Sequence, residues 1–359
     1  MNAPETQRPL VVRFGAFGDM ILLLPALRIL AGRYGAPCEV VGSGAWTEPL
    51  LRRDPAVARC FLLTSRRAPF GISQSQRRLV RWLRQRPAGP VYVFESDEKS
   101  HWLLRRGGVL PEWICSFRDH PRRPGEHVMA HGIRLARETP NALLHWAGTA
   151  VDSSPTPDVH PVVTQSDRAD CRDWLVRRGL AGGPLVLLQP GNKKTMRWGY
   201  RRRRGNVDYW PEENWARVIL GLRQALPESR VMLCGAPSER TLARDIVDHL
   251  GGRRDGVAIA TDDLPVPRLL ALLERAHSMI SVNTGPAHAA AAMGCPLVVM
   301  FGRHPARAVA SYAPPAASAP MRILLPDAGA ADGRIAGIPP ERVLAAWSCL
   351  LPAGVRPAN

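Results

Sequence analysis

The 359-residue chain is 45% hydrophobic and 22% charged, as is normal for a folded soluble protein, and its length predicts two domains rather than one core. No apolar run approaches the ~20 residues that span a bilayer, and the first residues lack the pattern of a signal peptide, so we exclude a membrane-spanning protein and expect a cytoplasmic one. The formal net charge of +17 favours polyanionic partners, namely nucleic acid, an anionic membrane or a phosphorylated glycolipid.

Short apolar runs alternate with helical patterns through the first half of the chain. Residues 10–14 are typical of a buried parallel strand, a turn follows at 15–18, and residues 19–34 have a helical pattern. Further strands are predicted at 38–42, 59–63, 91–94 and 113–117. Further helices are predicted at 76–86, around Leu103 and at 127–137. This alternation predicts a doubly wound parallel sheet.

A Pro-rich polar segment at 149–165 separates this half from a second alternation, and we interpret it as the interdomain linker. Strands are predicted at 184–188, 230–234, 257–261, 278–282 and 297–301. Helices are predicted at 166–178, 212–226, 238–250, 286–293 and, as the last one, about 338–351. We therefore predict two Rossmann-like domains, residues 1–155 and 156–359, each binding ligands at the carboxyl ends of its strands.

The loop after the first strand contains a candidate catalytic residue. Residues 13–20 read RFGAFGDM, a G-x-x-G-D pattern that differs from the G-x-G-x-x-G of dinucleotide-binding loops. The helix dipole stabilises the Asp19 carboxylate at this point, and that carboxylate would repel a pyrophosphate. Asp19 is therefore either a helix-starting residue or a general base.

Two later loops have the composition of a phosphate-binding site. Residues 188–198 read LQPGNKKTMRW and contain Lys193 and Lys194, two of the chain's three lysines. Backbone amides and ammonium groups there suit a diphosphate, although a solvated basic loop has the same composition. Residues 281–302 read SVNTGPAHAAAAMGCPLVVMFG, with Pro286 predicted at the first helical position. The start of that helix is either an anion site or an ordinary strand–turn–helix connection.

Several other residues are assigned less specifically. The arginine run 201–204 either contacts phosphate, an acidic acceptor or a membrane surface, or is a solvated loop. The pairs at Arg66–Arg67 and Arg122–Arg123 either contact acidic groups of an acceptor or are solvated surface residues. His288 either bonds a phosphate or holds the turn. The seven cysteines have no CxxC spacing, which favours buried thiols, and the remaining histidines have no metal-ligand spacing.

Three segments together resemble glycosyltransferase family 9, the bacterial ADP-heptose:lipopolysaccharide heptosyltransferases. They are GAFGDMILLLPAL at 15–27, QPGNKK through YWPEENW at 189–215, and the segment at 281–302. Their order and spacing fit nearly the whole chain, and the last is the most specific. The resemblance implies an α/β GT-B fold, in which two Rossmann-like domains with parallel sheets face a central cleft. It places the acceptor in the first domain and the nucleotide sugar in the second.

The resemblance also implies an inverting, metal-independent transfer without a cofactor, with Asp19 as catalytic base. The donor-binding residues expected from it are Gln189, Gly191, Lys193, Lys194, Asn283, Thr284, Gly285 and His288. The acceptor-binding residues that we expect are Gly18, Arg66, Arg67, Arg122 and Arg123. The expected partners are a nucleotide-sugar donor such as ADP-heptose, an anionic glycolipid acceptor such as core lipopolysaccharide, and transiently the inner membrane surface, with no nucleic acid.

The chain departs from the family pattern at two positions, which keeps other interpretations open. Asn283 stands where the motif commonly has Asp, and Asp208–Tyr209 stand where a basic residue usually precedes Trp-Pro, after an insertion at 199–207. A family member without catalysis is therefore one alternative. A sequence-independent nucleic-acid binder would explain the charge but lacks a motif, and an oxidoreductase or epimerase lacks the G-x-G-x-x-G fingerprint.

Overall fold

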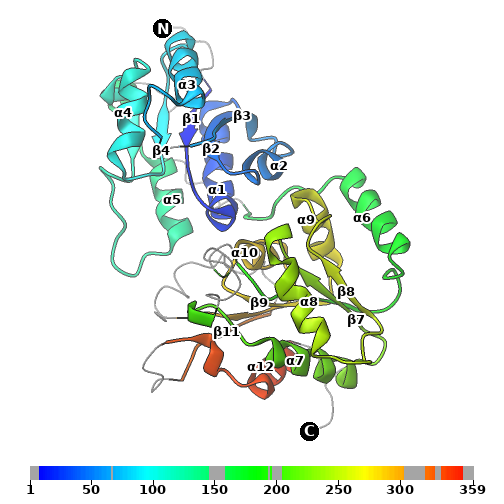
Figure 1. The fold of residues 1–359 in the computed structure, drawn as a ribbon. Helices are drawn as coiled ribbons and strands as arrows, with labels where there is room; N and C mark the ends of the chain where they lie inside the picture. Colours follow the sequence, from blue (N-terminus) through cyan, green and yellow to red (C-terminus); the bar gives the residue numbers. More distant parts are fainter. Residues whose placement is uncertain are drawn as a thin grey trace. The chain divides into compact units, whose positions relative to one another are not determined.

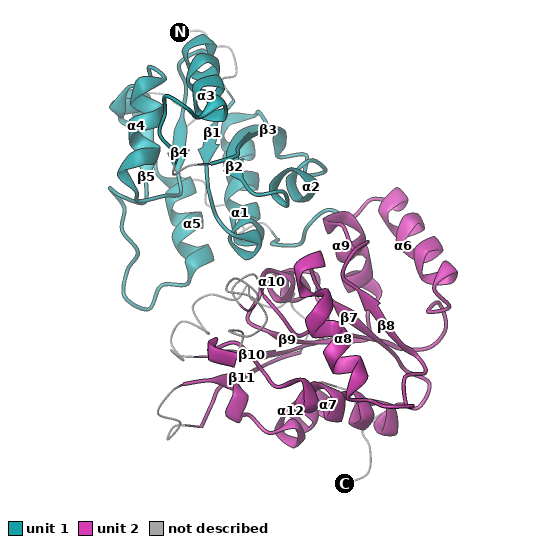
Figure 2. Cartoon of the chain, viewed as in Figure 1, with its two compact units in different colours: residues 1–162 teal, residues 163–359 magenta. Residues whose placement is uncertain are grey.

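The computed structural model describes residues 8–65, 68–144, 158–192, 195, 204–302, 320–327 and 333–350. The chain divides into two compact units, Met1–Val162 and Val163–Asn359 (Figure 2). Each unit has one parallel sheet between layers of helices (Figure 1), which confirms the predicted α/β class. The predicted boundary at 155/156 lies outside the described residues, and the assignment of acceptor and donor to the two halves stays a prediction.

The first unit has a five-stranded sheet in the order β3-β2-β1-β4-β5, with every neighbouring pair parallel. The strands are β1 Leu10–Val12, β2 Cys38–Ser43, β3 Val57–Leu63, β4 Val91–Val93 and β5 Ile114–Ser116. The helices are α1 Phe17–Tyr34, α2 Thr47–Leu51, α3 Gln74–Gln85, α4 Glu98–Arg106 and α5 Val128–Arg137, with 3₁₀ turns η1 Pro111–Trp113 and η2 Asn141–Leu143. Helix α1 packs against α2 and α5, and α3 packs against α4. The chain moves from β1 to β3 in one direction along the sheet and then crosses back to β4 and β5 in the other direction. Because each crossover between parallel strands is right-handed, α1 and α2 cover one face of the sheet and α3 and α4 cover the other.

Apolar periodicity explains why the helices of the first unit cover the sheet. Leu79, Val80 and Leu83 recur on one face of α3 and are buried against the sheet residues Leu10 and Val93. The arginines of α3 lie on the opposite, exposed face. Helix α1 ends at Gly35, whose φ of +59° is the left-handed conformation that glycine adopts without strain.

The second unit has a six-stranded sheet in the order β11-β10-β9-β6-β7-β8, again parallel throughout. The strands are β6 Leu185–Gln189, β7 Arg230–Cys234, β8 Val257–Ala260, β9 Ser278–Val282, β10 Leu297–Met300 and β11 Met321–Leu324. The helices are α6 Gln165–Arg177, α7 Glu212–Ala225, α8 Arg240–Asp248, α9 Val266–Arg275, α10 Gly285–Ala292 and α12 Pro340–Ser348, with 3₁₀ turns η5 Pro237–Glu239 and η6 Ile335–Gly337. Helix α7 packs against α8 and α12, and α9 packs against α6 and α10.

Three tryptophans fill the core of the second unit. Trp210 and Trp215 meet edge to face with ring centroids 4.9 Å apart, and both are fully buried. Trp347 is buried in the same cluster and donates its indole N–H to Ser278 Oγ at 2.8 Å. The Trp-Pro-containing segment of the sequence is therefore a core element that anchors α7 next to β6.

Both sheets have a switch point, where the strand order reverses direction. In the first sheet the chain runs from β1 outward to β3 and returns with β4 on the other side of β1. In the second it runs from β6 to β8 and returns with β9 on the other side of β6. Loops diverge at such points and leave room for ligands at the carboxyl ends of the strands.

Several predicted bounds were wrong. Helix α1 begins at Phe17, two residues before the predicted start, and α10 begins at Gly285, one residue before it, because residues of the preceding turns already have helical conformation. The helix predicted at 238–250 is a 3₁₀ turn followed by α8. The last helix is Pro340–Ser348, shorter than predicted. Helix α2 and strand β11 were not predicted, since a five-residue helix and a half-exposed four-residue edge strand have little periodicity.

The cysteines are free thiols, most of them buried, as predicted. Cys38, Cys115, Cys171, Cys234 and Cys295 are buried, whereas Cys60 is half-buried and Cys349 is exposed. Burial raises the pKa of Cys115 to about 12, so this thiol stays protonated at neutral pH. The buried thiols act as small apolar side chains of the cores.

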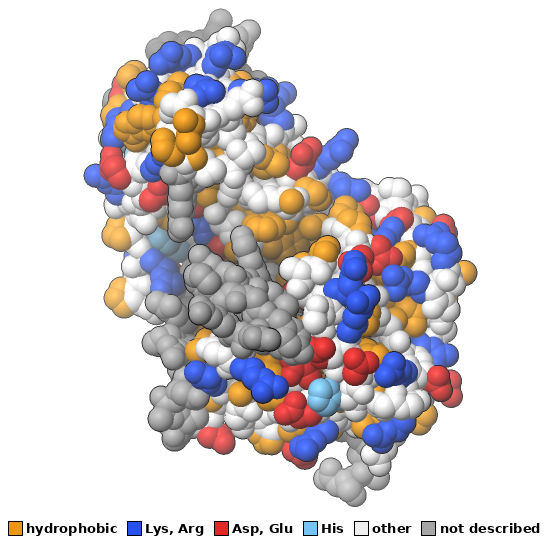
Figure 3. Space-filling view, in the orientation of Figure 1, with side chains coloured by type: hydrophobic (Ala, Val, Ile, Leu, Met, Phe, Trp, Pro, Cys, Tyr) orange, Lys and Arg blue, Asp and Glu red, His pale blue; other side chains and the backbone are white. Residues whose placement is uncertain are grey.

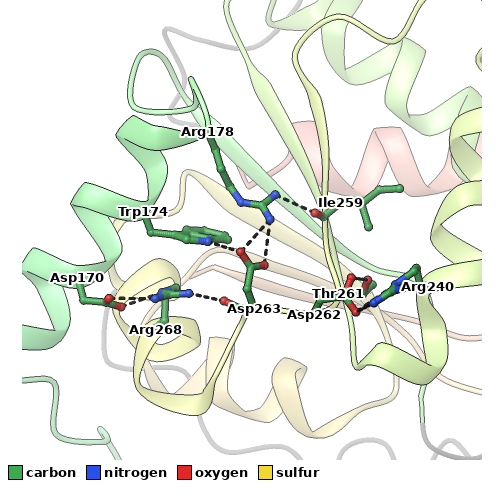
Figure 4. Close-up of polar contacts among 9 residues, drawn as sticks. All are labelled: Asp170, Trp174, Arg178, Arg240, Ile259, Thr261, Asp262, Asp263 and Arg268. Atoms are coloured by element: carbon green, nitrogen blue, oxygen red, sulfur yellow. Dashed lines mark hydrogen bonds and ion pairs between the residues drawn. The ribbon is translucent and has the colours of Figure 1, made fainter.

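A polar network joins α6 to the end of β8 (Figure 4). Trp174, which is 3% exposed, donates its indole N–H to Asp263 Oδ2 at 2.7 Å, and Arg178 donates to both carboxylate oxygens of Asp263 at 2.8 and 3.0 Å. Burial acts to raise the pKa of Asp263, but the hydrogen bonds from Trp174 and Arg178 outweigh it and lower this pKa. The ionised carboxylate therefore holds α6 onto the sheet.

An Asp263→Ala variant is expected to lose about 1–3 kcal/mol of unfolding free energy, because the buried Trp174 N–H loses its acceptor. Since the pKa of Asp263 is lower in the folded state, its contribution is present at neutral pH and is lost as the pH falls through the folded-state pKa. Urea unfolding at neutral and acid pH measures both effects. Asp255→Ala, at an exposed site, is the matched control. Equal stability of the two variants would refute this role.

Candidate functional site

Asp19 lies at the carboxyl edge of β1, in the first turn of α1. Its Oδ1 accepts from Arg13 Nη2 at 2.9 Å, and its Oδ2 accepts from the Ala16 backbone N–H at 2.8 Å. A Cβ on Gly15 would lie 2.3 Å from the Asp19 Cβ, so the loop approaches the helix as closely as only glycine allows. The Asp19 side chain is 36% exposed, which leaves the carboxylate open to a ligand. Both interpretations of Asp19, helix start and proton acceptor, fit this geometry.

Arg13 links Asp19 to a second carboxylate from the neighbouring strand. Glu95, two residues beyond β4, lies 3.6 Å from Arg13 Nη1 and accepts from the Phe14 backbone N–H at 2.7 Å. Arg13 also donates to the Phe94 carbonyl, and its side chain is only 16% exposed. The guanidinium is therefore fixed between two carboxylates at the switch point of the first sheet. This arrangement holds the Asp19 side chain in one orientation.

The other residues expected around the acceptor are less closely defined. Gly18 is buried in the first turn of α1, beside Asp19. Arg122 and Arg123 are exposed in the loop between β5 and α5, and the Arg123 backbone N–H donates to Glu126 Oε2 at 2.9 Å. That loop follows the carboxyl end of β5, the neighbour of β4. Arg66 and Arg67 lie outside the described residues.

At the second switch point, the loop after β6 is tied to the loop after β9. Asn192 Nδ2 donates to the Asn283 carbonyl at 3.2 Å and to Asp208 Oδ2 at 3.3 Å. Its Oδ1 accepts from the Thr195 backbone N–H at 2.9 Å and lies 3.0 Å from Thr195 Oγ1. Gln189 Nε2 donates to the Gly191 carbonyl at 2.9 Å. Asn192 therefore joins three segments that are distant in sequence.

Gly191 is in close contact with a buried acid, Glu239 of the 3₁₀ turn η5, which follows the neighbouring strand β7. A Cβ at residue 191 would lie 2.3 Å from Glu239 Oε1, so a larger residue displaces one or the other. Glu239 is 6% exposed, and its Oε2 accepts from the Ala236 backbone N–H at 2.7 Å. Burial raises the pKa of the Glu239 carboxyl. Gly191, one of the expected donor-binding residues, therefore lies next to a carboxyl group that takes up a proton more readily than an exposed glutamate does.

The turn after β9 has the helix start that the sequence suggested. Thr284 caps α10, and its Oγ1 accepts from the Ala287 backbone N–H at 3.3 Å. Gly285 is the first helical residue and Pro286, which has no N–H, is the second. The Gly285 N–H is therefore the first amide of the helix, at its positive end. His288 is half-buried one turn later, with its own N–H directed at the Thr284 carbonyl at 3.4 Å.

One departure from the expected pattern has a structural explanation. Asp208, 5% exposed, accepts from Asn192, and the Tyr209 hydroxyl donates to Glu212 Oε2 at 2.5 Å. Of the two residues before Trp-Pro, Asp208 therefore supports the loop after β6, and Tyr209 supports the first turn of α7. Lys193, Lys194 and Arg201 to Arg203 lie outside the described residues, and Arg204 is exposed.

Two negative findings apply to the described part of the chain. No three His, Cys, Asp or Glu side chains there are grouped as metal ligands. Within the same residues, no helix is both long and apolar enough to cross a membrane.

Three residues at these sites were missed by the sequence analysis: Glu95, Asn192 and Glu239. Glu95 and Glu239 follow buried strands within a few residues, and Asn192 lies in a loop already singled out for its lysines. Polar residues directly after parallel strands are the signal that could have found them. Their roles depend on which strands are neighbours, which sequence spacing does not specify.

Comparison with known proteins gives a family match for part of the second unit and a fold for nearly the whole chain. Residues 202–321 match the family described as glycosyltransferase family 9 (heptosyltransferase). No curated protein sequence matches the chain. Among solved structures, ADP-heptose lps heptosyltransferase II of E. coli is 20% identical, with a TM-score of 0.72 over 96% of this chain and 98% of that one.

Two other solved structures are similar over nearly their full lengths. A glycosyl transferase family 9 protein of Veillonella parvula DSM 2008 is 16% identical, with a TM-score of 0.74, and 97% of this chain and 98% of that one are covered. The E. coli heptosyltransferase WaaC with ADP is 17% identical, with a TM-score of 0.66, over 94% and 98%. These likenesses confirm the GT-B class of fold.

Proposed function

Because this chain is a glycosyltransferase that carries a family 9 (heptosyltransferase) domain, we propose that it transfers heptose from ADP-heptose to the core of lipopolysaccharide or a related anionic glycan. The transfer inverts the configuration at the donor carbon and needs no metal ion. The donor proposal is supported by the E. coli heptosyltransferase structure that contains ADP. The expected resemblance to this family is confirmed by the match at 202–321.

In this proposal Asp19 is the general base. The acceptor hydroxyl lies against the exposed side of the Asp19 carboxylate and transfers its proton as it attacks C1 of the donor sugar. Arg13 keeps the carboxylate oriented through its 2.9 Å hydrogen bond, and Glu95 balances the charge of Arg13. The attack comes from the face opposite the leaving diphosphate, so the new bond has the inverted configuration.

The donor binds at the second switch point. The Gly285 N–H at the start of α10 and the positive end of that helix stabilise the negative charge that grows on the diphosphate. Lys193 and Lys194 supply cationic contacts to the same phosphates. Gln189, Gly191 and Asn283 shape the loops around the donor, which Asn192 holds together through its hydrogen bond to the Asn283 carbonyl at 3.2 Å. His288 contacts the phosphate or supports the turn.

The acceptor binds along the carboxyl edge of the first sheet. Gly18 lets the acceptor approach the start of α1, and Arg66, Arg67, Arg122 and Arg123 contact its carboxylate or phosphate groups. A lipid-linked acceptor implies that a cytoplasmic enzyme meets the inner membrane transiently, which the net charge of +17 favours.

One observation carries this proposal above the others. The candidate base lies at the switch point of one sheet, while the candidate phosphate-binding turn lies at the switch point of the other. A two-substrate transfer needs such a division between an acceptor side and a donor side. A catalytically inactive homologue would have no need for an Arg13 side chain that is only 16% exposed and holds Asp19 in place.

Thermal unfolding of the full chain with ADP, GDP, UDP or NAD, each with and without Mg²⁺, tests the donor. A nucleotide present at about 100 times its Kd adds about 2.7 kcal/mol to the stability. We expect an upward shift in Tm with ADP that does not depend on Mg²⁺. A shift with GDP or UDP alone would change the donor and keep the mechanism, whereas a response to NAD alone would refute the proposal.

A further inference from the structure

The first unit has a strongly basic surface that the proposed transfer does not use. It consists of Arg77, Arg78, Arg81 and Arg84 on the exposed face of α3, together with Arg106 at the end of α4. We call these five residues the α3 basic surface. In Figure 3 basic side chains gather over α3, next to apolar side chains. Helix α3 contains no acidic residue, so its charge is not balanced from within.

None of the five guanidinium groups is paired with a carboxylate among the residues that the structure describes. Arg77 donates to the Gly71 carbonyl, and Arg84 Nε donates to the Arg106 carbonyl at 3.3 Å. By contrast, Arg105 of α4 and Arg118 both pair with Glu98. The five cations are therefore held close together without a counterion from the protein, which favours an external anionic partner.

Apolar side chains lie among these arginines. Phe70 and Arg106 line a hollow together with Arg77, Arg81 and Arg84 of α3. Ile72, just before α3, is 76% exposed. Leu110 is 53% exposed and lines a second hollow that also includes Arg84. A cationic helix face next to exposed aliphatic side chains is the pattern of a segment that rests at the boundary between lipid headgroups and acyl chains.

The α3 basic surface is separate from the site of the proposed reaction. Helix α3 leads into Arg86, which donates to the Arg8 carbonyl just before β1, and the Leu10 N–H donates to the Pro90 carbonyl just before β4. The carboxyl end of α3 therefore reaches the amino edge of the sheet. Asp19 lies at the carboxyl edge. The end of this surface formed by Arg84 therefore lies at the edge of the sheet opposite Asp19.

The aromatic residues of this region argue against nucleic acid. Single-stranded nucleic acid binds by stacking bases on free aromatic faces. Here Arg106 lies over the Phe70 ring at 4.5 Å and over the Trp102 ring at 5.2 Å from the centroids, and these two rings meet edge to face. Trp82 is stacked on Phe61 and contacts Arg59. These rings already have partners within the protein.

We propose that the α3 basic surface docks the protein onto an anionic lipid bilayer, with the five arginines on lipid phosphates and Ile72 inserted at the headgroup level. The proposal deepens the proposed function, on which it rests for the presence of a lipid-linked acceptor, by assigning the docking surface. Each arginine near an anionic bilayer contributes about 1 kcal/mol of attraction, so several together bind measurably and reversibly. Docking at one end of the first unit leaves its Asp19 edge free for the acceptor.

The test is sedimentation of the full chain with vesicles made of equal parts phosphatidylcholine and phosphatidylglycerol, and with vesicles of phosphatidylcholine alone. The variant Arg78→Gln, Arg81→Gln, Arg84→Gln is expected to bind the anionic vesicles about a hundredfold more weakly than the wild type. Glutamine has nearly the helix propensity of arginine, so α3 stays folded, which circular dichroism checks. The matched control is Arg172→Gln, Arg177→Gln, Arg253→Gln, which removes the same charge from exposed sites of the second unit.

Loss of vesicle binding by the α3 variant and not by the control supports the proposal. An equal loss in both variants, or no preference of the wild type for anionic vesicles, overturns it. A loss of binding to a DNA duplex with vesicle binding unchanged also overturns it and assigns the surface to nucleic acid. Donor and acceptor are absent from this assay, so its failure leaves the assignment as a glycosyltransferase intact. Transfer to a soluble, lipid-free acceptor is expected to be unchanged in the α3 variant.

Discussion

Replacing Asp19 by Asn is expected to lower kcat about a thousandfold, the range of a lost general base, while the Kd for the nucleoside diphosphate stays unchanged. Asn has no basic site to accept the proton of the acceptor hydroxyl. Its amide oxygen can still accept from the Ala16 N–H, as Asp19 Oδ2 does at 2.8 Å, so the first turn of α1 is kept. Steady-state transfer assays and nucleotide titration measure the two quantities separately.

The matched control for this substitution is Asp173→Asn, at an exposed position of α6. It changes the charge by the same amount and is expected to leave kcat and Kd at wild-type values. Wild-type turnover by Asp19→Asn would show that Asp19 is not the general base and serves only to start helix α1. A large loss of nucleotide affinity in the same variant would place Asp19 on the donor side instead.

Replacing Asn192 by Ala is expected to have the second largest effect. The variant loses its hydrogen bonds to Asp208, the Asn283 carbonyl and Thr195, which should lower the unfolding free energy by about 2–3 kcal/mol. The loop after β6 is then no longer tied to the turn after β9, so donor affinity should fall by about tenfold or more, since an unlinked loop must be ordered on binding. Urea unfolding and nucleotide titration measure these effects.

Asn141→Ala provides the comparison, because Asn141 is exposed in the first unit, at the start of a 3₁₀ turn. It is expected to change stability by less than about 0.5 kcal/mol and donor affinity not at all. If Asn192→Ala is less stable but binds the donor with unaltered affinity, Asn192 stabilises the fold and does not contribute to donor binding. That result would also weaken the assignment of the donor to the turn at Asn283 to Gly285.

Local sequence features predicted the individual elements well. Apolar runs located β6, β7 and β9 to within a residue or two, and the Gly285–Pro286 pair located the start of α10, because these signals depend on neighbouring residues. Bounds failed where a cap decided them, as at Phe17. Short elements such as α2 and β11 failed because a few residues carry too little pattern.

The candidate site was predicted unevenly for a related reason. Asp19, Thr284 and Gly285 stand in loops whose motifs resemble a family, so they could be proposed as site residues without the fold. Glu95 was not, since it lies beside Arg13 only because β4 pairs with β1, and about half of the first unit separates these two strands in the sequence. The basic face of α3 was also missed as a surface, because its meaning depends on Ile72, Phe70 and Arg106 being next to it.

By itself, the sequence determined the α/β class, the alternation of elements and the resemblance to family 9, because periodicity and turn chemistry act over a few residues. The tertiary structure alone decided which strands are neighbours. It brought Val12 beside Val93 and Leu188 beside Ile280, and so created both switch points. Strand order results from packing between segments that are far apart in the chain. It is determined by the burial of apolar sheet faces against helices, which no local sequence pattern specifies.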